Sequence, residues 1–120
     1  MKITTTLKIP TYSCELIITV TDDLVGEANR IYKKYKIKEE FEGECEGAVV
    51  LIDIDKYYLL LNAKYLSHNT IAHEIFHATV RVTEDRDITD EEAQAWLAGH
   101  VTGVIYKFLE KKNIAITHGR

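Results

Sequence analysis

Four short segments of the chain carry the apolar patterns that are typical of β-strands. They comprise residues 2–9, 14–20, 48–54 and 57–63. The first segment places Ile3, Leu7 and Ile9 on one face, and the second is rich in β-branched side chains. Residues 10–13 and 55–56 separate the members of each pair, which predicts two β-hairpins.

A first helix is expected directly after the first hairpin. Its apolar positions recur at helical spacing and are Leu24, Ala28, Ile31, Tyr32 and Tyr35. Thr21 is the expected N-terminal cap, with Asp22 and Asp23 in the first turn, where the helix dipole favours negative charge. Residues 41–47 are acidic and carry two glycines, so we expect a loop there.

Two further helices are expected in the second half of the chain. Ser67 can cap a helix that runs to about residue 82, and Thr89 or Asp90 can begin a last helix that runs to about Lys112. Residues 83–88 between them are charged and irregular. The order β-β-α-β-β-α-α predicts an α+β fold, with an antiparallel sheet of two hairpins and three helices.

Composition and charge narrow the class of protein. The 120 residues are 46% hydrophobic and 28% charged, as expected of one domain spanning 1–120. The net charge of −4 argues against a nucleic-acid partner. Residues 1–13 lack a signal-peptide core, and the longest aliphatic run, residues 48–52, cannot span a bilayer. We therefore expect a cytoplasmic protein without a membrane partner, and its oligomeric state stays open.

The candidate chemistry lies in the motif His73-Glu74-Ile75-Phe76-His77, an H-E-x-x-H inside the second predicted helix. Residues four apart lie one above the other on a helix, so both imidazoles can reach one metal ion. Glu74 points to the neighbouring side, where it can act as a general base. With five His and twelve Glu in the chain, chance gives about 0.02 such motifs per chain.

The residues around this motif are apolar on nearly every side of the helix: Ile71, Ala72, Ile75, Phe76, Ala78 and Val80. This pattern predicts a buried helix. Two histidines and a glutamate are costly in such surroundings unless they share a partner, and a metal ion is such a partner. The surroundings therefore favour a zinc site over an accidental pair of core histidines.

A zinc site of this kind needs a third protein ligand and a position open to water. A metzincin would carry Gly at position 80 and His at position 83, whereas this chain has Val80 and Thr83. His100 lies too far along the last helix to join a ligand there. A carboxylate from the last helix or the segment before it is the other common solution, and the candidates are Asp85, Asp87, Asp90, Glu91 and Glu92.

Glu92 is the third ligand that we expect. It shares a helical stripe with Trp96, Gly99 and Gly103, and small residues on that stripe would let the last helix approach the H-E-x-x-H helix closely. Two alternatives stay open. Glu91 or an aspartate can take the ligand role instead, or Glu92 can form a capping box with Thr89 and bind no metal.

Two stretches of the chain resemble a known family: His73-Glu74-x-x-His77 and Asp90-Glu91-Glu92-Ala93-x-Ala95-Trp96-Leu97. The family is that of the small zincin metallopeptidases with a glutamate third ligand, as in compact H-E-x-x-H proteins of phages and bacteria. The chain is more distantly similar to ImmA/IrrE-type and SprT-like peptidase domains. The resemblance covers residues 71–107. It implies a zincin-like fold whose edge strand receives an extended substrate.

The motif and the resemblance together predict a zinc-dependent hydrolase, most specifically a metallopeptidase. In this interpretation His73, His77 and Glu92 hold Zn²⁺, and Glu74 is the general base. The peptide substrate would bind as an extended strand against residues 48–54 or 57–63. A metal-containing binding or regulatory protein without turnover is the alternative, and a hydrolase of a non-peptide amide is a third.

Overall fold

The computed structural model describes residues 1–116. Within this range the chain forms four strands, three α-helices and two single-turn 3₁₀ helices. They are β1 (Lys2–Ile9), η1 (Pro10–Tyr12), β2 (Cys14–Thr21), α1 (Leu24–Lys34), β3 (Gly47–Asp53), β4 (Lys56–Asn62), η2 (Ala63–Tyr65), α2 (His68–Glu84) and α3 (Glu91–Lys111). The predicted α+β class and the predicted order of elements are confirmed. Among the described residues, no helix is both long and apolar enough to cross a membrane.

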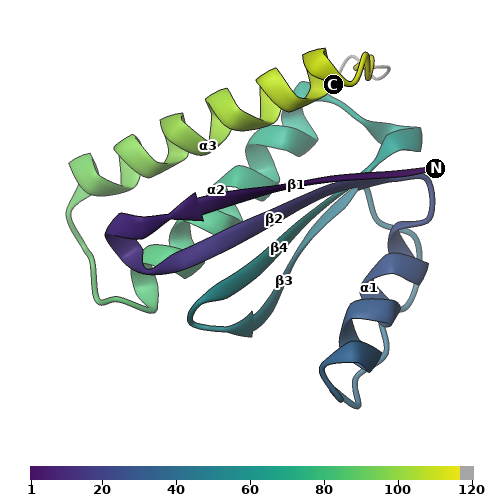
Figure 1. Ribbon diagram of the computed structural model, residues 1–120, viewed down its shortest axis with the longest axis horizontal. Helices are drawn as coiled ribbons and strands as arrows, with labels where there is room; N and C mark the ends of the chain where they lie inside the picture. Colours follow the sequence, from purple (N-terminus) through teal and green to yellow (C-terminus); the bar gives the residue numbers. More distant parts are fainter. Residues whose placement is uncertain (117–120) are drawn as a thin grey trace.

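The four strands form one mixed sheet in the order β1-β2-β4-β3, seen in Figure 1. Each hairpin is antiparallel, as expected, but the hairpins meet through a parallel pairing of β2 with β4. The expected sheet of two antiparallel hairpins is therefore present, but it is a mixed sheet because its central pairing is parallel. After β2 the chain passes through α1 to the far edge, forms β3 there, and returns along β4 beside β2. The sheet is left with β1 and β3 as its two edges.

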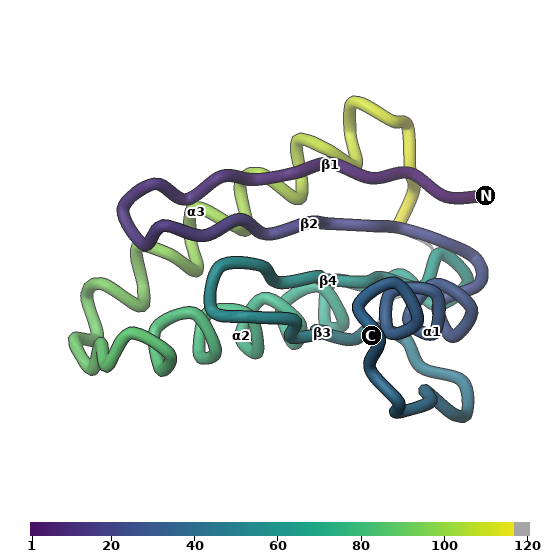
Figure 2. The backbone as a smooth tube through the Cα atoms, turned by 60° about the horizontal axis from the view of Figure 1, so that its bottom comes forward, coloured from purple at the N-terminus to yellow at the C-terminus, as the bar shows by residue number. Residues whose placement is uncertain are grey.

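The helices cover the two faces of the sheet unequally. The helices α2 and α3 lie on one face and share a core with alternate residues of β2 and β4, including Leu16, Ile18, Leu59 and Leu61. On the opposite face α1 packs against Tyr58, Leu60 and Val50. Figure 2 shows α1 at one end of the sheet, while α2 and α3 extend along its length. Because β2 and β4 are covered on both faces, they are almost continuously apolar.

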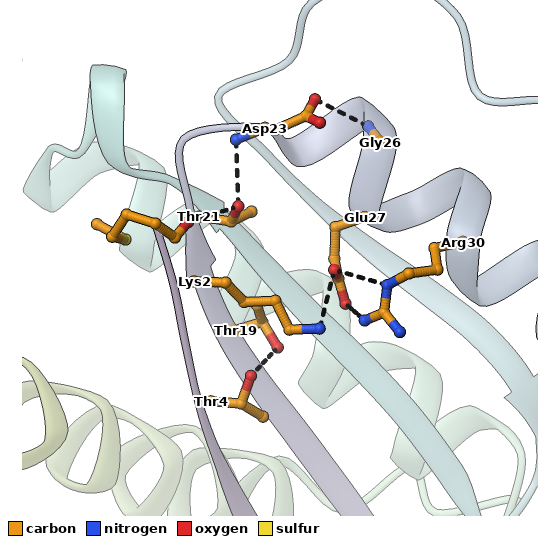
Figure 3. A network of polar contacts seen from close by, with 9 residues as sticks. Lys2, Thr4, Thr19, Thr21, Asp23, Gly26, Glu27 and Arg30 are labelled. Atoms are coloured by element: carbon orange, nitrogen blue, oxygen red, sulfur yellow. Dashed lines mark hydrogen bonds and ion pairs between the residues drawn. The ribbon is translucent and has the colours of Figure 1, made fainter.

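The start of α1 differs from the expectation. Asp23 is the N-terminal cap, because its side chain accepts a hydrogen bond from the Gly26 N–H at 3.1 Å. Thr21 is the last residue of β2, and its hydroxyl accepts a bond from the Asp23 N–H instead. Figure 3 shows the ion pairs of the buried Glu27. Its pair with Lys2 of β1, at 3.2 Å, joins α1 to the sheet, and its pair with Arg30 lies within α1.

The starts of α2 and α3 follow local sequence signals. The Ser67 hydroxyl accepts a hydrogen bond from the Thr70 N–H at 3.0 Å, which confirms Ser67 as the cap of α2. Of the two expected starts of the last helix, Asp90 is the cap, and its side chain accepts from the Glu92 N–H. The capping box between Thr89 and Glu92 is therefore replaced by an Asp90 cap.

Candidate functional site

The H-E-x-x-H motif lies in a groove between α2 and the edge strand β3. Two adjoining hollows of about 310 Å³ each form this groove, and both are lined by Gly47, His73 and Glu74. We call it the β3–α2 groove. Its remaining lining residues are Cys45, Glu46, Asn69 and Thr70 at one end and Ala48, Val49, His77 and Arg81 at the other.

The two histidines lie next to each other on the outer side of α2. Their Nε2 atoms are 3.0 Å apart, and their rings meet edge to face with centroids 4.6 Å apart. The His73 side chain is 62% exposed, and the neighbouring Phe76 is 65% exposed. The expectation of a helix buried on all sides was thus wrong, because α2 packs only one side against the sheet and turns this stripe to solvent.

Glu74 is the buried member of the motif. It is 5% exposed and lies on the side of α2 that faces β3. Burial raises the pKa of its carboxyl group, and the nearby His73 opposes this shift. The nearest ionisable group is His73, whose Nε2 lies 4.0 Å from Glu74 Oε2. A carboxyl group that is shielded from water yet open to a groove is suited to taking up a proton.

Gly47 allows β3 to lie this close to Glu74. A Cβ atom at position 47 would lie 2.6 Å from Glu74 Cγ and 3.0 Å from its Oε2, which is closer than van der Waals contact permits. Because β3 lies so close to the Glu74 side chain, its first residue has to be glycine. Sequence reasoning missed this residue, because nothing local links position 47 to position 74.

The donor atoms of the pair are suited to a zinc ion. Two imidazole nitrogens at about 2.0–2.1 Å from one tetrahedral metal are about 3.3 Å apart, close to the 3.0 Å found between His73 Nε2 and His77 Nε2. Neutral imidazole is a favoured zinc ligand. The spacing of the pair is therefore compatible with two of the three ligands that the motif calls for. Among residues 1–116, no His, Cys, Asp or Glu joins these two in a group of three that could hold a metal.

The third predicted ligand, Glu92, is not brought to the pair. It lies exposed in the first turn of α3, and its stripe faces away from α2. No side chain or backbone atom of another element lies within 4 Å of where Gly99 or Gly103 would carry a Cβ, and Trp96 is 53% exposed. The expected contact of this stripe with α2 was therefore wrong. The small residues of α3 that do face α2 are Ala95, Ala98 and Thr102, in a groove that Glu91 also lines.

Two of the other acidic candidates have structural partners, and a third lies in a turn. Asp85 accepts a hydrogen bond from the Tyr57 hydroxyl at 2.5 Å. Asp87 lies in the turn after α2 with a positive φ of 54°, and Asp90 caps α3. Glu91, which faces α2, and Glu92, which does not, remain as carboxylates near the start of α3 without such a role.

Two histidines outside the motif lie within residues 1–116, and neither lines the β3–α2 groove. His68 Nδ1 is 2.7 Å from the Tyr106 hydroxyl, and the two rings stack. His100 stacks on Trp96 with ring centroids 5.1 Å apart. Both rings thus contact aromatic side chains of α3.

Comparison with known proteins adds no relative. No protein-family model matches the chain, and no curated protein or solved structure is significantly similar to it. The functional argument therefore depends on the site itself.

Proposed function

We propose that this protein is a zinc-dependent hydrolase, and specifically a metallopeptidase that acts in the β3–α2 groove. One observation carries the proposal: two exposed imidazoles with adjacent Nε2 atoms lie beside a buried carboxyl group, in a groove that runs along a sheet edge. An accidental pair of histidines would not require a buried, poorly partnered Glu74 next to it.

The edge strand beside the motif is suited to binding a peptide. The Asn62 N–H donates to the Glu46 carbonyl at 2.9 Å, so residues 46 and 62 form a hydrogen-bonded pair of the β3–β4 ladder. Backbone groups alternate in direction along a strand, so those of Gly47, Val49 and Leu51 point away from β4. A substrate strand can pair with these free groups.

This arrangement favours one of the two strands that the sequence left open. The strand β4 is paired on both sides, with β2 and with β3, so its backbone groups are not available to a peptide. The strand β3 is an edge strand, and its residues line the groove that holds His73 and Glu74. We therefore assign substrate binding to β3.

Glu74 is the general base in this proposal. Zn²⁺ held by His73 and His77 would supply a Lewis acid that polarises the scissile carbonyl and acidifies water. A Glu74 carboxylate oxygen takes a proton from the water molecule whose oxygen bonds to the carbonyl carbon. When the C–N bond breaks, Glu74 delivers that proton to the leaving nitrogen. The products are a carboxylate and an amine.

The third ligand stays a prediction. For Glu92 to serve, the first turn of α3 has to rotate, since Glu92 shares its exposed stripe with Trp96. Glu91 needs a smaller change, because its side chain already lines the groove between α2 and α3 with Phe76 and Val80. We retain Glu92 from the resemblance and name Glu91 as the alternative that the arrangement of α3 favours.

A second function has its own supporting observation. The free edge of β3 is compatible with a metal-containing binding or regulatory protein without turnover, because an edge strand can hold a peptide whether or not the peptide is cut. Such a protein would bind an extended peptide at β3 and release it unchanged. A hydrolase of a non-peptide amide would share the catalytic groups but would not need the free edge of β3.

The experiment that tests the proposal uses Glu74→Gln. Peptide libraries are incubated with zinc-loaded parent and variant proteins, and the products are identified by mass spectrometry. The parent should cut peptides, and Glu74→Gln should lose at least about 100-fold in rate, the lower end of a general-base contribution, while it retains its fold and zinc. Glu110→Gln, at an exposed glutamate near the end of α3 and outside the groove, is the matched control and should retain the parent rate. Equal rates for parent and Glu74→Gln would overturn the assignment.

A further inference from the structure

The β3–α2 groove carries opposite charges at its two ends. Arg81 lines the end next to His77 and Val49, and it is the one cationic residue among those described as lining the groove. At the other end Glu46 lines the groove, where its carboxylate accepts a hydrogen bond from the Thr70 hydroxyl at 2.8 Å. A strand lying in the groove therefore meets positive charge at one end and negative charge at the other.

Arg81 continues the stripe of the two histidines. His73, His77 and Arg81 are spaced four residues apart on α2, so their side chains follow one another along the same side of the helix. The Arg81 guanidinium is 48% exposed, and its ion pair with Glu84, at 3.5 Å, lies at the surface. Such exposed pairs contribute little free energy, so a substrate carboxylate can compete for the guanidinium.

We propose that Arg81 determines substrate specificity by binding an Asp or Glu side chain of the peptide. This inference rests on the proposed function of the groove and names the class of peptide that it takes. A guanidinium offers a planar pair of N–H donors that matches a carboxylate, so the chemistry of recognition is specific. The acidic end at Glu46 repels the same side chain and thereby fixes which end of the groove it occupies.

The direction of the strands gives the position of this acidic residue. The early part of α2 lies beside residues 46–47, and Arg81 lies beside Val49, so α2 and β3 run in the same direction. A peptide that pairs antiparallel with β3, the more stable arrangement, has its N-terminal part beside Arg81. Arg81 lies about 9 Å along the helix from the centre of the histidine pair, or two to three residues of extended chain.

The test compares two charge reversals that change the net charge equally. Arg81→Glu reverses the charge in the groove, and Lys33→Glu reverses an exposed charge on α1, on the other face of the sheet. Both are assayed with a peptide library that varies Glu, Gln and Lys at every position. The parent and Lys33→Glu should prefer Glu over Gln about fivefold at the second or third residue before the cut bond, in keeping with an exposed ion pair. Arg81→Glu should prefer Lys there.

A binding measurement separates this inference from the proposed function. Fluorescein-labelled peptides that differ by one Glu or Gln are titrated with the parent and both variants, and anisotropy reports affinity without turnover. If no peptide is cut but the Glu peptide binds more tightly to the parent than to Arg81→Glu, hydrolysis is wrong and the role of Arg81 holds. The proposed role of Arg81 is overturned if peptides are cut or bound without a preference that depends on Arg81. It is also overturned if no peptide binds. If the parent prefers an acidic residue after the cut bond, the antiparallel alignment of the peptide with β3 is wrong.

Discussion

Two polar clusters, one on α2 and one just beyond its C-terminal end, differ in how completely their groups are partnered. At the end of the helix, Arg86 donates to the carbonyls of Tyr12 at 2.7 Å, Val82 at 3.1 Å and Ile54, and to the Tyr57 hydroxyl at 3.0 Å. We call Tyr57, Asp85 and Arg86 the Arg86 cluster. Its donors are used within the protein, so it joins η1, the β3–β4 turn and α2 into one unit.

The motif cluster comprises His73, Glu74 and His77 and lies on α2, two to three turns earlier in the chain. Its polar groups have fewer hydrogen-bond partners within the protein. The two histidines contact mainly each other, and Glu74 has only His73 as an ionisable neighbour, at 4.0 Å. Burial likewise acts differently in the two clusters. In the Arg86 cluster burial and the Asp85 hydrogen bond raise the pKa of Tyr57 to about 12, which keeps the hydroxyl proton in place as a donor. In the motif cluster burial raises the pKa of Glu74, which improves it as a proton acceptor for a substrate. One cluster is built for stability, and the other retains capacity for a ligand.

The largest expected effect on stability comes from Arg86→Met in the Arg86 cluster. The substitution leaves three carbonyls and the Tyr57–Asp85 pair without their charged donor, and we expect a loss of about 2–4 kcal/mol in the free energy of unfolding. Arg81→Met removes an equal charge from the motif side of the helix and should change stability by less than about 0.5 kcal/mol. Urea denaturation of both variants measures the difference. Similar losses in the two would remove the distinction between the clusters.

A smaller loss is expected from Gly47→Ala at the motif cluster. The added methyl group would overlap Glu74 Cγ, 2.6 Å away, so β3 or the Glu74 side chain has to move, at a cost of about 1–3 kcal/mol. The activation free energy of hydrolysis should rise by more than the free energy of unfolding falls, because the proposed base Glu74 is displaced. The control is Gly103→Ala on α3, where no atom of another element lies within 4 Å and where alanine should stabilise the helix by about 0.5–1 kcal/mol. Unaltered stability and hydrolysis in the Gly47→Ala variant would refute the close approach of β3 to Glu74.

The smallest expected effect has the opposite sign. In chelator-treated protein, Glu74→Gln should raise the free energy of unfolding by about 0.5–1 kcal/mol, because a buried and poorly partnered carboxylate is replaced by a neutral amide. The exposed Glu84→Gln should change it by only a few tenths of a kcal/mol. Chemical denaturation at neutral pH measures both. Destabilisation by Glu74→Gln would show that its carboxylate has structural partners, as the Arg86 cluster does.

Local signals predicted much of this structure. The Ser67 cap, the helical spacing around it and the H-E-x-x-H motif all act within one helix, so α2 and its histidine pair followed from the sequence. The α1 start was misjudged by two residues, because Thr21 and Asp23 are both good caps and only the β2 ladder shows that Thr21 still belongs to the strand.

Long-range packing could not be predicted in the same way. The parallel pairing of β2 with β4 depends on which edge the chain reaches after α1, and the patterns of the two hairpins are compatible with either arrangement. The stripe on α3 was ambiguous, because Gly99 and Gly103 on one side and Ala95 and Ala98 on the other are both small. Arg81 was the exception, since its spacing from His77 could have been recognised in the sequence.

The measurement that tests the central claim most directly is zinc binding by the histidine pair. Chelator-treated parent protein and a His77→Ala variant are titrated with Zn²⁺ by calorimetry, with His100→Ala, an exposed histidine on α3, as the control. The parent and His100→Ala should bind about one zinc ion per chain with equal affinity, and His77→Ala should lose at least about 100-fold in affinity. Equal binding by His77→Ala and the parent, or no zinc binding by the parent, would contradict the assignment of the β3–α2 groove as a metal-dependent site.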